Sequence, residues 1–443
     1  MFDSFSGNMT GSCTADVLNV RSGAGTGYSK TGTVSYGDSL TILSETTDSS
    51  GAKWYKISCG NLTGYVSAAY VQLISSGSQG SSDADFESYM TKQGFPESYK
   101  LYLRTLHEQH PKWIFTAQKL GVDWNTALKE ECVVGRNLVH SSALASWKSM
   151  EKGAYDFNGG GGGGLDGSWV AASKEIIMYY MDPRNFLNDT YIFMFENQSY
   201  DPSYQTESGV KTILADTFMS GSYTCPDTKK KYTYSQTFMD AAKKSGVSPY
   251  HLAARCRNGQ GVNGAPQSLG TVKGYEKAYA TSTMTAAEMG CKYAKTTNPT
   301  YLLPWTNQYK SIVGGSIFLG TGYITKGQDT LYLQKFDMVD GGNGLYYHQY
   351  MTCVFGQANE AISLKNAYSQ DILNSAMEFK IPVYNNMPDK LCPKPTSSGD
   401  NNNYLKSLSV SGTSISPKFD KFTTSYTQND TPPKSMRRYL LLL

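Results

Sequence analysis

The chain has 443 residues, a formal net charge of +3, 39% hydrophobic residues and 33 tyrosines. Its length predicts two or three domains. The low net charge, without a long basic run, argues against nucleic-acid binding, and no apolar run reaches the ~18 residues of a membrane-spanning helix. Eight cysteines are scattered without a Cys-x-x-Cys pair or a Cys/His cluster, which argues against a zinc site. They leave two alternatives open: a Cys13–Cys59 disulfide, or free buried thiols.

The N-terminal region, residues 14–74, has the pattern of a small β domain. Short runs of Val, Ile, Tyr and Trp are interrupted by Gly, Asn and Ser at short intervals, which predicts strands. A domain of this size removes its sheet edges by closing into a barrel. The residues before it, MFDSFSGNMTGS, have neither a basic start nor an apolar core, so we expect no secretory signal peptide. Residues 75–86 are rich in Gly and Ser and predict a flexible linker.

After the linker the apolar spacing becomes helical. We expect helices within residues 86–115, 123–139, 168–181, 249–258, 307–324 and 344–370, the last two with many small residues for close packing. Asp123 and Ser248 are expected to cap two of these helices, and Asp182-Pro183 to start a turn after a third. Asn258-Gly259 suits a left-handed helix end. The six glycines at 159–164 predict a flexible loop tip, because glycine cannot hold one conformation without a large entropic cost. They do not make a phosphate loop, since no Lys-Ser/Thr follows them.

The C-terminal residues depart from the helical pattern. Residues 392–403 read as a second linker, 404–427 as the opening strands of a β-sandwich, and 428–443 as an aberrant tail that continues no strand pattern.

Three stretches of the β domain resemble the bacterial SH3 domain of cell-wall proteins. They are LNVRSGAGTGYS (Leu18–Ser29), KWYKI (Lys53–Ile57) and TGYVSAAYV (Thr63–Val71). The resemblance implies binding of peptidoglycan, often through its stem peptide. The alternative is a spacer barrel that binds nothing, since fold alone does not fix function.

Residues 87–391 resemble the clostridial type of endo-β-N-acetylglucosaminidase, in glycoside hydrolase family 73. The resemblance rests on long stretches in order, among them QGFPESYKLYLRTLHEQHPKWIF, DGSWVAASKEIIMYYMDPRNFLND, VSPYHLAARCR and YYHQYMT. It implies an α+β chain in which the SH3-like barrel precedes a mainly helical, lysozyme-like domain with a cleft, its core at about 231–370. It also implies action on peptidoglycan glycan strands in the cell wall, outside the membrane, without metal or organic cofactor. Residues 404–427 resemble part of a cadherin-like sandwich domain.

The family carries its general acid in a motif close to Arg-Gln-Glu-Gln-Gly. A glycosidic oxygen leaves very slowly unless a carboxyl group protonates it as the bond breaks. Carried over residue by residue, Arg257, Asn258, Gln260 and Gly261 match the motif, and Gly259 stands at the glutamate. Glycine has no side chain that could donate a proton, so the resemblance predicts reduced or lost hydrolysis.

Other positions of the resemblance supply candidate site residues. Glu276 is the candidate for an auxiliary acid, with a solvated surface glutamate as the alternative. The residues expected to line the cleft are Arg257, Gln260, Tyr275, Tyr279, Gln334, His348, Gln349 and Tyr350. For His348 a packed core histidine is an equal alternative. Glu130 and Glu131 are expected to be ordinary exposed helical glutamates.

Three functions remain open from the sequence. The first is a peptidoglycan glucosaminidase with impaired hydrolysis. The second is a non-catalytic protein that binds peptidoglycan and is anchored by its SH3 domain. The third is a peptide-binding scaffold that uses the SH3 domain alone. The missing glutamate favours the second, and the extent of the resemblance favours the first. No Ser/His/Asp signature is present.

Overall fold

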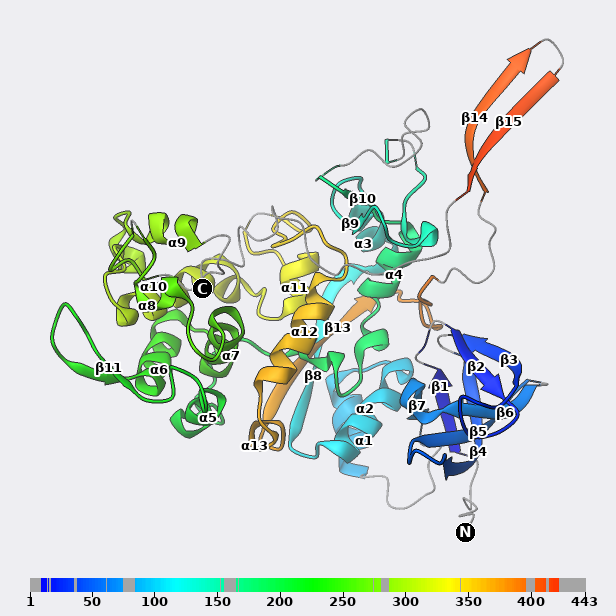
Figure 1. Ribbon diagram of the computed structural model, residues 1–443, viewed down its shortest axis with the longest axis horizontal. Helices are drawn as coiled ribbons and strands as arrows, with labels where there is room; N and C mark the ends of the chain where they lie inside the picture. The colour runs from blue at the N-terminus through cyan, green and yellow to red at the C-terminus, as the bar shows by residue number, and fades with distance from the viewer. Residues whose placement is uncertain are drawn as a thin grey trace.

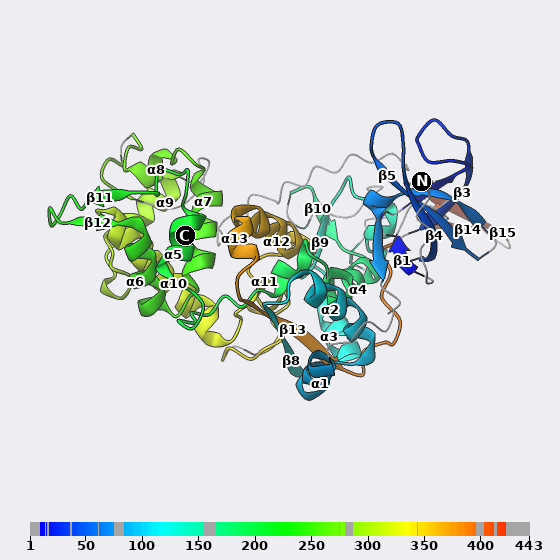
Figure 2. The same ribbon diagram turned by 90° about the horizontal axis from the view of Figure 1, so that it is seen from below.

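The computed structural model (Figure 1) describes residues 9–13, 15, 17–35, 38–60, 62–74, 84–151, 153–154, 165, 167–273, 275–279, 287–342, 344–395, 403–411 and 414–421. The six-glycine run, most of the first linker, the first eight residues and the tail from 428 onward lie outside the described residues. Figures 1 and 2 place the N-terminal strands at one end of the molecule and the helices of residues 207–322 at the other. The chain is thus α+β, as expected.

The N-terminal domain is a seven-stranded antiparallel sheet. Its strands are β1 (Met9–Cys13), β2 (Val17–Arg21), β3 (Lys30–Ser35), β4 (Ser39–Thr47), β5 (Lys53–Cys59), β6 (Leu62–Ser67) and β7 (Val71–Ile74), in the order β3-β2-β6-β5-β4-β1-β7. Alternate residues such as Leu18 and Val20 point inward, because successive side chains of a strand face opposite sides. They form an apolar core separate from that of the helical region.

A parallel strand pair lies at the centre of the second domain. Strand β8 (Trp113–Asp123) pairs with β13 (Met377–Asn385), with Phe115 opposite Phe379. Helices α1 (Ala84–Gln93) and α2 (Glu97–Gln109) precede β8. The expectation of helix up to residue 115 was therefore wrong at its end: Phe115 is fully buried in the sheet. Its apolar neighbours come from both ends of the domain, which local spacing does not reveal.

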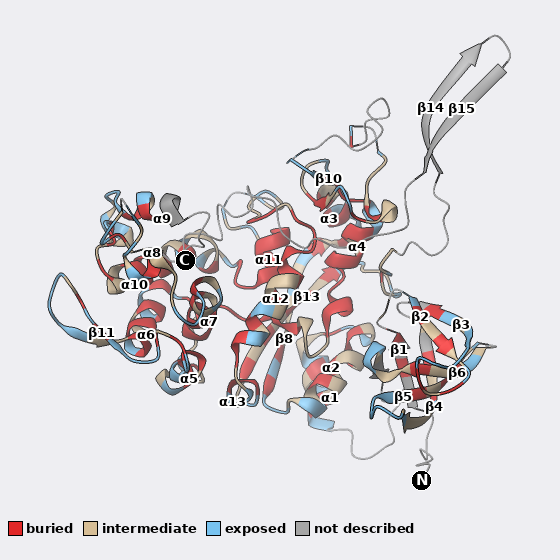
Figure 3. Ribbon diagram, in the orientation of Figure 1, coloured by how far each residue is buried: buried red, intermediate tan, exposed pale blue. Residues whose placement is uncertain are grey.

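Further helices pack around this strand pair. They are α3 (Trp124–Glu131), α4 (Lys174–Met181), α11 (Leu331–Phe336), α12 (Gly356–Ala367) and α13 (Gln370–Leu373). Figure 3 shows buried residues concentrated in α4 and α11. Residues 344–355 are not helical, against expectation. The loop is held instead by contacts with buried groups, since His348 N donates to Asp337 Oδ2 and Tyr350 N to the Gln334 carbonyl.

A helical lobe follows in the chain between α4 and α11. It contains α5 (Glu207–Ile213), β11 (Ser222–Thr224), β12 (Lys231–Thr233), α6 (Tyr234–Ser245), α7 (Pro249–Gln260), α8 (Pro266–Leu269), α9 (Ala287–Ala294) and α10 (Gln308–Gly322). The small residues of α10 allow the close packing expected from sequence. A Cβ on Gly320 would lie 2.2 Å from the Ser245 carbonyl oxygen of α6.

Local capping signals were confirmed. The Asp123 carboxylate accepts from Thr126 N at 2.9 Å, and the Ser248 hydroxyl accepts from His251 N at 3.3 Å. Asp182 caps the short 3-10 helix that starts at Pro183, and α4 ends at Met181. Each cap satisfies backbone N–H groups that have no partner within the helix.

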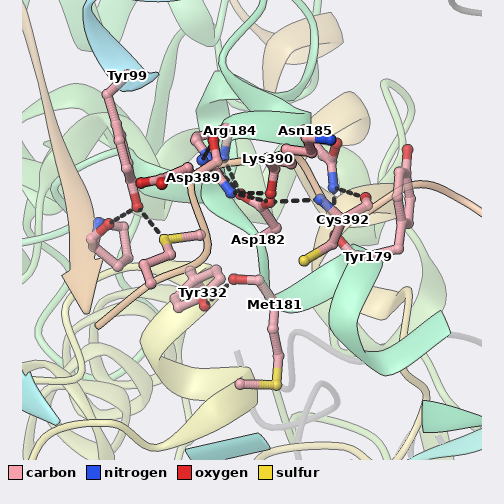
Figure 4. A network of polar contacts seen from close by, with 12 residues as sticks. Tyr99, Tyr179, Met181, Asp182, Arg184, Asn185, Tyr332, Asp389, Lys390 and Cys392 are labelled. Atoms are coloured by element: carbon pink, nitrogen blue, oxygen red, sulfur yellow. Dashed lines mark hydrogen bonds and ion pairs between the residues drawn. The ribbon is translucent and has the colours of Figure 1, made fainter. Parts of the chain in front are cut away.

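Asp182 and Arg184 also form a buried clamp on the C-terminal segment (Figure 4). The Arg184 guanidinium binds both oxygens of the Asp182 carboxylate, at 2.9 and 2.8 Å, and donates to the carbonyls of Asp389 and Lys390. Cys392 N donates to Asp182 Oδ2 at 3.0 Å. Cys392, where we expect the second linker to begin, is itself buried, and Pro395 accepts a hydrogen bond from Trp147 Nε1.

All eight cysteines are free thiols, so the expected Cys13–Cys59 disulfide was wrong. The alternative of free buried thiols holds for six of them, while Cys59 and Cys132 are partly exposed. Among the described residues, none of the helices has the length and apolar character that crossing a membrane requires. Strands β14 (Asn403–Ser411) and β15 (Ser414–Lys421) form an antiparallel hairpin after the second domain.

Candidate functional site

Helix α7 carries the motif in which Gly259 replaces the expected glutamate. The helix begins after Ser248 with Pro249 at its first position and runs through Gly259 to Gln260. The expected left-handed end at Asn258-Gly259 was wrong, because Gly261 is the residue with positive φ, at 70°. Gly259 therefore lies in the last helical turn and is partly exposed.

The residues beside Gly259 fasten α7 to its neighbours. Arg257 Nη1 donates to the carbonyls of Ile213, the last residue of α5, and of Ala215, at 2.7 and 3.1 Å. Asn258 Nδ2 donates to the Ser363 carbonyl of α12 at 2.8 Å. Arg257 is thus engaged with backbone carbonyls, and its role in the structure is to hold the end of α7.

A hollow of about 310 Å³, its mouth included, opens beside the last turns of α7. Its described lining comes from four helices and two loops and consists of Phe218, Met219, Tyr234, Cys256, Gln260, Ser268, Tyr279, Gln308, Ser311 and Ile312. The structure thus brings two of the expected site residues, Gln260 and Tyr279, to one cavity. None of its described lining residues is acidic or basic.

Tyr275 and Glu276 lie on the loop that precedes Tyr279. The ring of Tyr275 carries the Lys295 ammonium group at 4.9 Å from its centroid, a cation–π contact. Glu276 is exposed, which is the surface alternative stated for it. An exposed carboxyl group lacks the burial that keeps a general acid protonated near neutral pH.

The other four expected residues gather around α11, which Figures 1 and 2 place among the central elements rather than in the helical lobe. Gln334 is buried and donates to Gln198 Oε1 at 2.7 Å. His348 Nδ1 lies 2.5 Å from Gln328 Oε1, and its ring stacks on Tyr323 with centroids 4.5 Å apart. His348 is half-buried, and burial lowers its pKa. Tyr350 is 4% exposed, and burial raises its pKa.

Gln349 belongs to a buried ring of polar groups with Glu131. The Glu131 carboxylate accepts from Asn137 Nδ2 at 2.7 Å and from Gln349 Nε2 at 2.8 Å. Lys335 Nζ donates to Asn137 Oδ1 and Gln349 Oε1, at 2.7 and 3.0 Å. The two amides thus connect an anion to a cation. The expectation of an exposed Glu131 was wrong: its exposure is 0%, because α11 and the loop at residue 349 cover it. Burial raises its pKa and lowers that of Lys335.

Two more glutamates were not expected at internal positions from the sequence: Glu196 is buried, and the side chain of Glu360 is 20% exposed. Glu360 of α12 lies 4.0 Å from Arg255 of α7, and burial raises its pKa. Glu196 is 3% exposed and accepts from the Tyr368 hydroxyl at 2.6 Å. Burial raises the pKa of Glu196 to about 8. Its place in the apolar run YIFMFEN was the available signal for burial.

Glu196 makes the stability of the folded chain depend on pH. Its pKa rises from an ordinary 4.5 to about 8, so the folded state holds a proton that the unfolded state has lost between these values. The stabilisation that this proton gives the folded state is complete below pH 4.5 and is lost as the pH rises through 8. We expect the free energy of unfolding to fall by about 1 kcal/mol per pH unit from this group between pH 5.5 and 7.5.

Urea unfolding of the parent and of Glu196→Gln at several pH values measures this slope. Gln keeps the shape but cannot ionise, so the variant should lose less stability across the window. Equal slopes for the two proteins would contradict a protonated Glu196.

Comparison with known proteins finds a domain match and relatives named autolysins and glucosaminidases. Residues 16–72 match the bacterial SH3 domain. The chain is 28% identical over 234 residues to a bifunctional autolysin of Staphylococcus epidermidis, a match covering 49% of this chain and 16% of that protein. It is 25% identical over 231 residues to a β-N-acetylglucosaminidase of Bacillus subtilis, covering 49% of this chain and 23% of that protein. It is therefore a homologue of autolysins and glucosaminidases that carries a bacterial SH3 domain, and it matches less than a quarter of the length of these relatives.

Solved structures of the same group also match. The crystal structure of a major bifunctional autolysin aligns with a TM-score of 0.41 at 18% identity, covering 61% of this chain and 99% of that one. The crystal structure of S. aureus glucosaminidase B aligns with a TM-score of 0.42 at 21% identity, covering 62% and 95%.

Proposed function

We propose that the chain is a peptidoglycan-directed glucosaminidase homologue of glycoside hydrolase family 73 that acts at the cell wall, with hydrolysis much reduced or absent. One observation supports the proposal: the residue that the resemblance aligns with the general acid is Gly259, which lies in the last turn of α7 and has no side chain. Loss of a general acid typically lowers a rate by about 10²–10⁴. The alternative within this proposal is a protein that only binds.

The surroundings of Gly259 support the loss of activity. The cavity beside α7 has no Asp or Glu among its described lining residues. Glu276, our candidate auxiliary acid, is exposed. Glu360 of α12 faces α7, and its carboxylate lies 4.0 Å from Arg255. We assign this half-buried ion pair a role in holding the two helices together.

The proposed ligands are the glycan strands and the stem peptides of peptidoglycan. The relatives are named autolysins and glucosaminidases, and this chain carries a bacterial SH3 domain. We assign the peptide to the SH3 domain, where Tyr28 and Tyr70 are 54% and 51% exposed. Exposed tyrosines offer a flat apolar face and a hydrogen-bonding hydroxyl group.

The glycan is assigned to the helical domain. Gln260 and Tyr279 are the residues proposed to face it directly, because their side chains line the cavity beside Gly259. Arg257, Gln334, His348, Gln349 and Tyr350 are proposed to support the domain indirectly, since their side chains are hydrogen-bonded to other protein groups or, for Tyr350, buried.

Co-sedimentation with purified Gram-positive cell walls tests the binding. We expect the full chain to pellet with intact walls and, more weakly, with walls from which an amidase has removed the stem peptides. Cellulose, a β-1,4 glucan without acetamido groups or peptides, serves as the control and should leave the chain in solution. A chain that stays in solution with both wall preparations would contradict the proposed function.

A further inference from the structure

The helical lobe carries the excess positive charge of the chain. Residues 207–322 contain 13 Lys and Arg against 6 Asp and Glu, whereas the rest of the chain contains 27 against 31. The formal charge is therefore +7 in the lobe and −4 elsewhere. Because the two parts nearly cancel, the total of +3 conceals this asymmetry. A charge excess confined to one lobe indicates a partner of opposite sign.

Five exposed lysines lie on two consecutive elements of the lobe. Lys229–Lys231 occupy the turn between β11 and β12 and the first residue of β12, which leads directly into α6. Lys243 and Lys244 lie in the last turn of α6. Each of the five is exposed and forms no ion pair with a described residue. Figures 1 and 2 show the hairpin projecting from the outer end of the lobe, where a large partner could reach it.

Tyr309, in the first turn of α10, connects the two sets of lysines. Lys244 Nζ donates to its hydroxyl oxygen at 2.9 Å and lies 5.3 Å from its ring centroid. The ring of Tyr232, which follows Lys231 in β12, lies 5.3 Å from the same ring. The hairpin and the end of α6 therefore form one surface, with two partly exposed tyrosines between the lysines.

The acids of this surface do not balance the lysines. Asp227, in the turn of the hairpin, already has its own cation, because Lys310 Nζ lies 3.0 Å from its carboxylate. The hydrogen bond from the Thr306 hydroxyl and the contact with Lys310 lower the pKa of Asp227. Asp240 is the one acid in the sequence of α6. Within residues 222–245, all of which the structure describes, five lysines thus remain against Asp240.

The form of the surface favours a polymer with repeated anionic groups. Lysine ammonium groups bind phosphate as point charges. Helix α6 has 12 residues and is thus about 18 Å long, so the lysines are spread over more than a single phosphate group spans. None of the exposed large apolar residues that the structure describes lies within residues 222–245, although a membrane-surface segment needs apolar side chains that enter the lipid.

We propose that Lys229–Lys231, Lys243 and Lys244 bind a polyol-phosphate polymer of the cell wall, of the teichoic acid class. The inference rests on the proposed function, because the wall is where the chain would meet such a polymer. Each phosphodiester of the polymer carries one negative charge for an ammonium group, and the polyol hydroxyl groups suit the hydroxyl groups of Tyr232 and Tyr309. The polymer would hold the lobe at the wall independently of the glycan.

Calorimetry of the full chain with a polyglycerol phosphate, freed of lipid and of alanyl esters, tests the binding directly. We expect binding at 50 mM salt that weakens roughly tenfold or more at 200 mM salt, because ions compete with each ammonium–phosphate contact. Walls treated with hydrofluoric acid lose their phosphodiester polymers and keep glycan and peptide. The parent should sediment with these walls more weakly than with untreated walls.

The triple variant Lys229→Gln, Lys230→Gln, Lys231→Gln locates the contact. It removes three of the five charges from exposed positions, so it should fold as the parent does and bind the polymer about fivefold or more weakly. The triple variant Lys229→Arg, Lys230→Arg, Lys231→Arg keeps the charges and should bind as the parent does. Circular dichroism confirms that both are folded.

A second set of exposed lysines gives the matched control. The variant Lys92→Gln, Lys112→Gln, Lys129→Gln removes the same charge from positions outside the lobe and should keep the parent's affinity for the polymer. Equal losses in the two glutamine variants would overturn the proposed surface, because net charge alone would then explain the binding.

The remaining outcomes separate this inference from the proposed function. No binding of the polymer at 50 mM salt, or equal sedimentation with treated and untreated walls, would overturn the inference and leave wall binding standing. Equal affinity for a DNA duplex or for phosphatidylglycerol vesicles, at matched phosphate concentration, would overturn the assignment to a wall polymer. Sedimentation with untreated walls and none with treated walls would support the inference and refute the proposed binding of glycan and peptide.

Discussion

The Gly259→Glu variant is expected to release reducing N-acetylglucosamine ends from Gram-positive cell walls about 10²–10⁴ times faster than the parent chain. The substitution returns a carboxyl group to the motif position that lacks one, at the end of α7. The position is helical and partly exposed, and glutamate is a better helix former than glycine by about 0.5–1 kcal/mol. We therefore expect the variant to fold at least as stably as the parent.

Gly259→Gln is the matched control for this gain. Glutamine has the shape of glutamate and no acidic proton, so the control should release ends at the parent's rate. A rise of the same size in both variants would show that bulk, and not acidity, is what the position lacks. A folded, wall-binding Glu variant that is no faster than the parent would contradict the assignment of the acid to this position.

Arg184→Met is expected to destabilise the helical domain by about 3–5 kcal/mol. Arg184 and Asp182 are 2% and 0% exposed, so removal of the guanidinium group leaves a buried carboxylate without its cation. The carbonyls of Asp389 and Lys390 lose their donor in the same step (Figure 4). Urea unfolding followed by tryptophan fluorescence measures the loss.

The exposed ion pair of Lys211 and Glu207 serves as the control for the Arg184→Met variant. Lys211 pairs with Glu207 on the surface of α5, with its side chain 60% exposed, and Lys211→Met should change the stability by less than about 0.5 kcal/mol. A loss below about 1 kcal/mol for Arg184→Met would mean that the C-terminal segment is held by other contacts.

The elements that depend on neighbouring residues were predictable from the sequence. Asp123 and Ser248 cap helices as expected, because a cap needs only the N–H groups two or three positions ahead. The pairing of β13 with β8 was not predictable in this way. Phe115 pairs with Phe379, and nothing in the sequence near either residue identifies its partner.

The candidate site divides along the same line. The absence of an acid at Gly259 was visible directly, since it needed only the motif around it. The burial of Glu131 was not, because its partners Lys335 and Gln349 lie about two hundred positions away. The cavity beside α7 was not predictable either, since its lining residues Gln260 and Gln308 lie on different helices that tertiary packing brings together.

Loss of hydrolysis with retention of wall binding is tested most directly by measuring binding and cutting by the parent chain on one preparation of purified, dye-labelled Gram-positive cell walls. We expect the parent to sediment with the walls and to release neither dye nor reducing N-acetylglucosamine ends above background. Release by the parent at the rate of Gly259→Glu would contradict it. The acid would then lie elsewhere, and Glu276→Gln would be the next variant to assay.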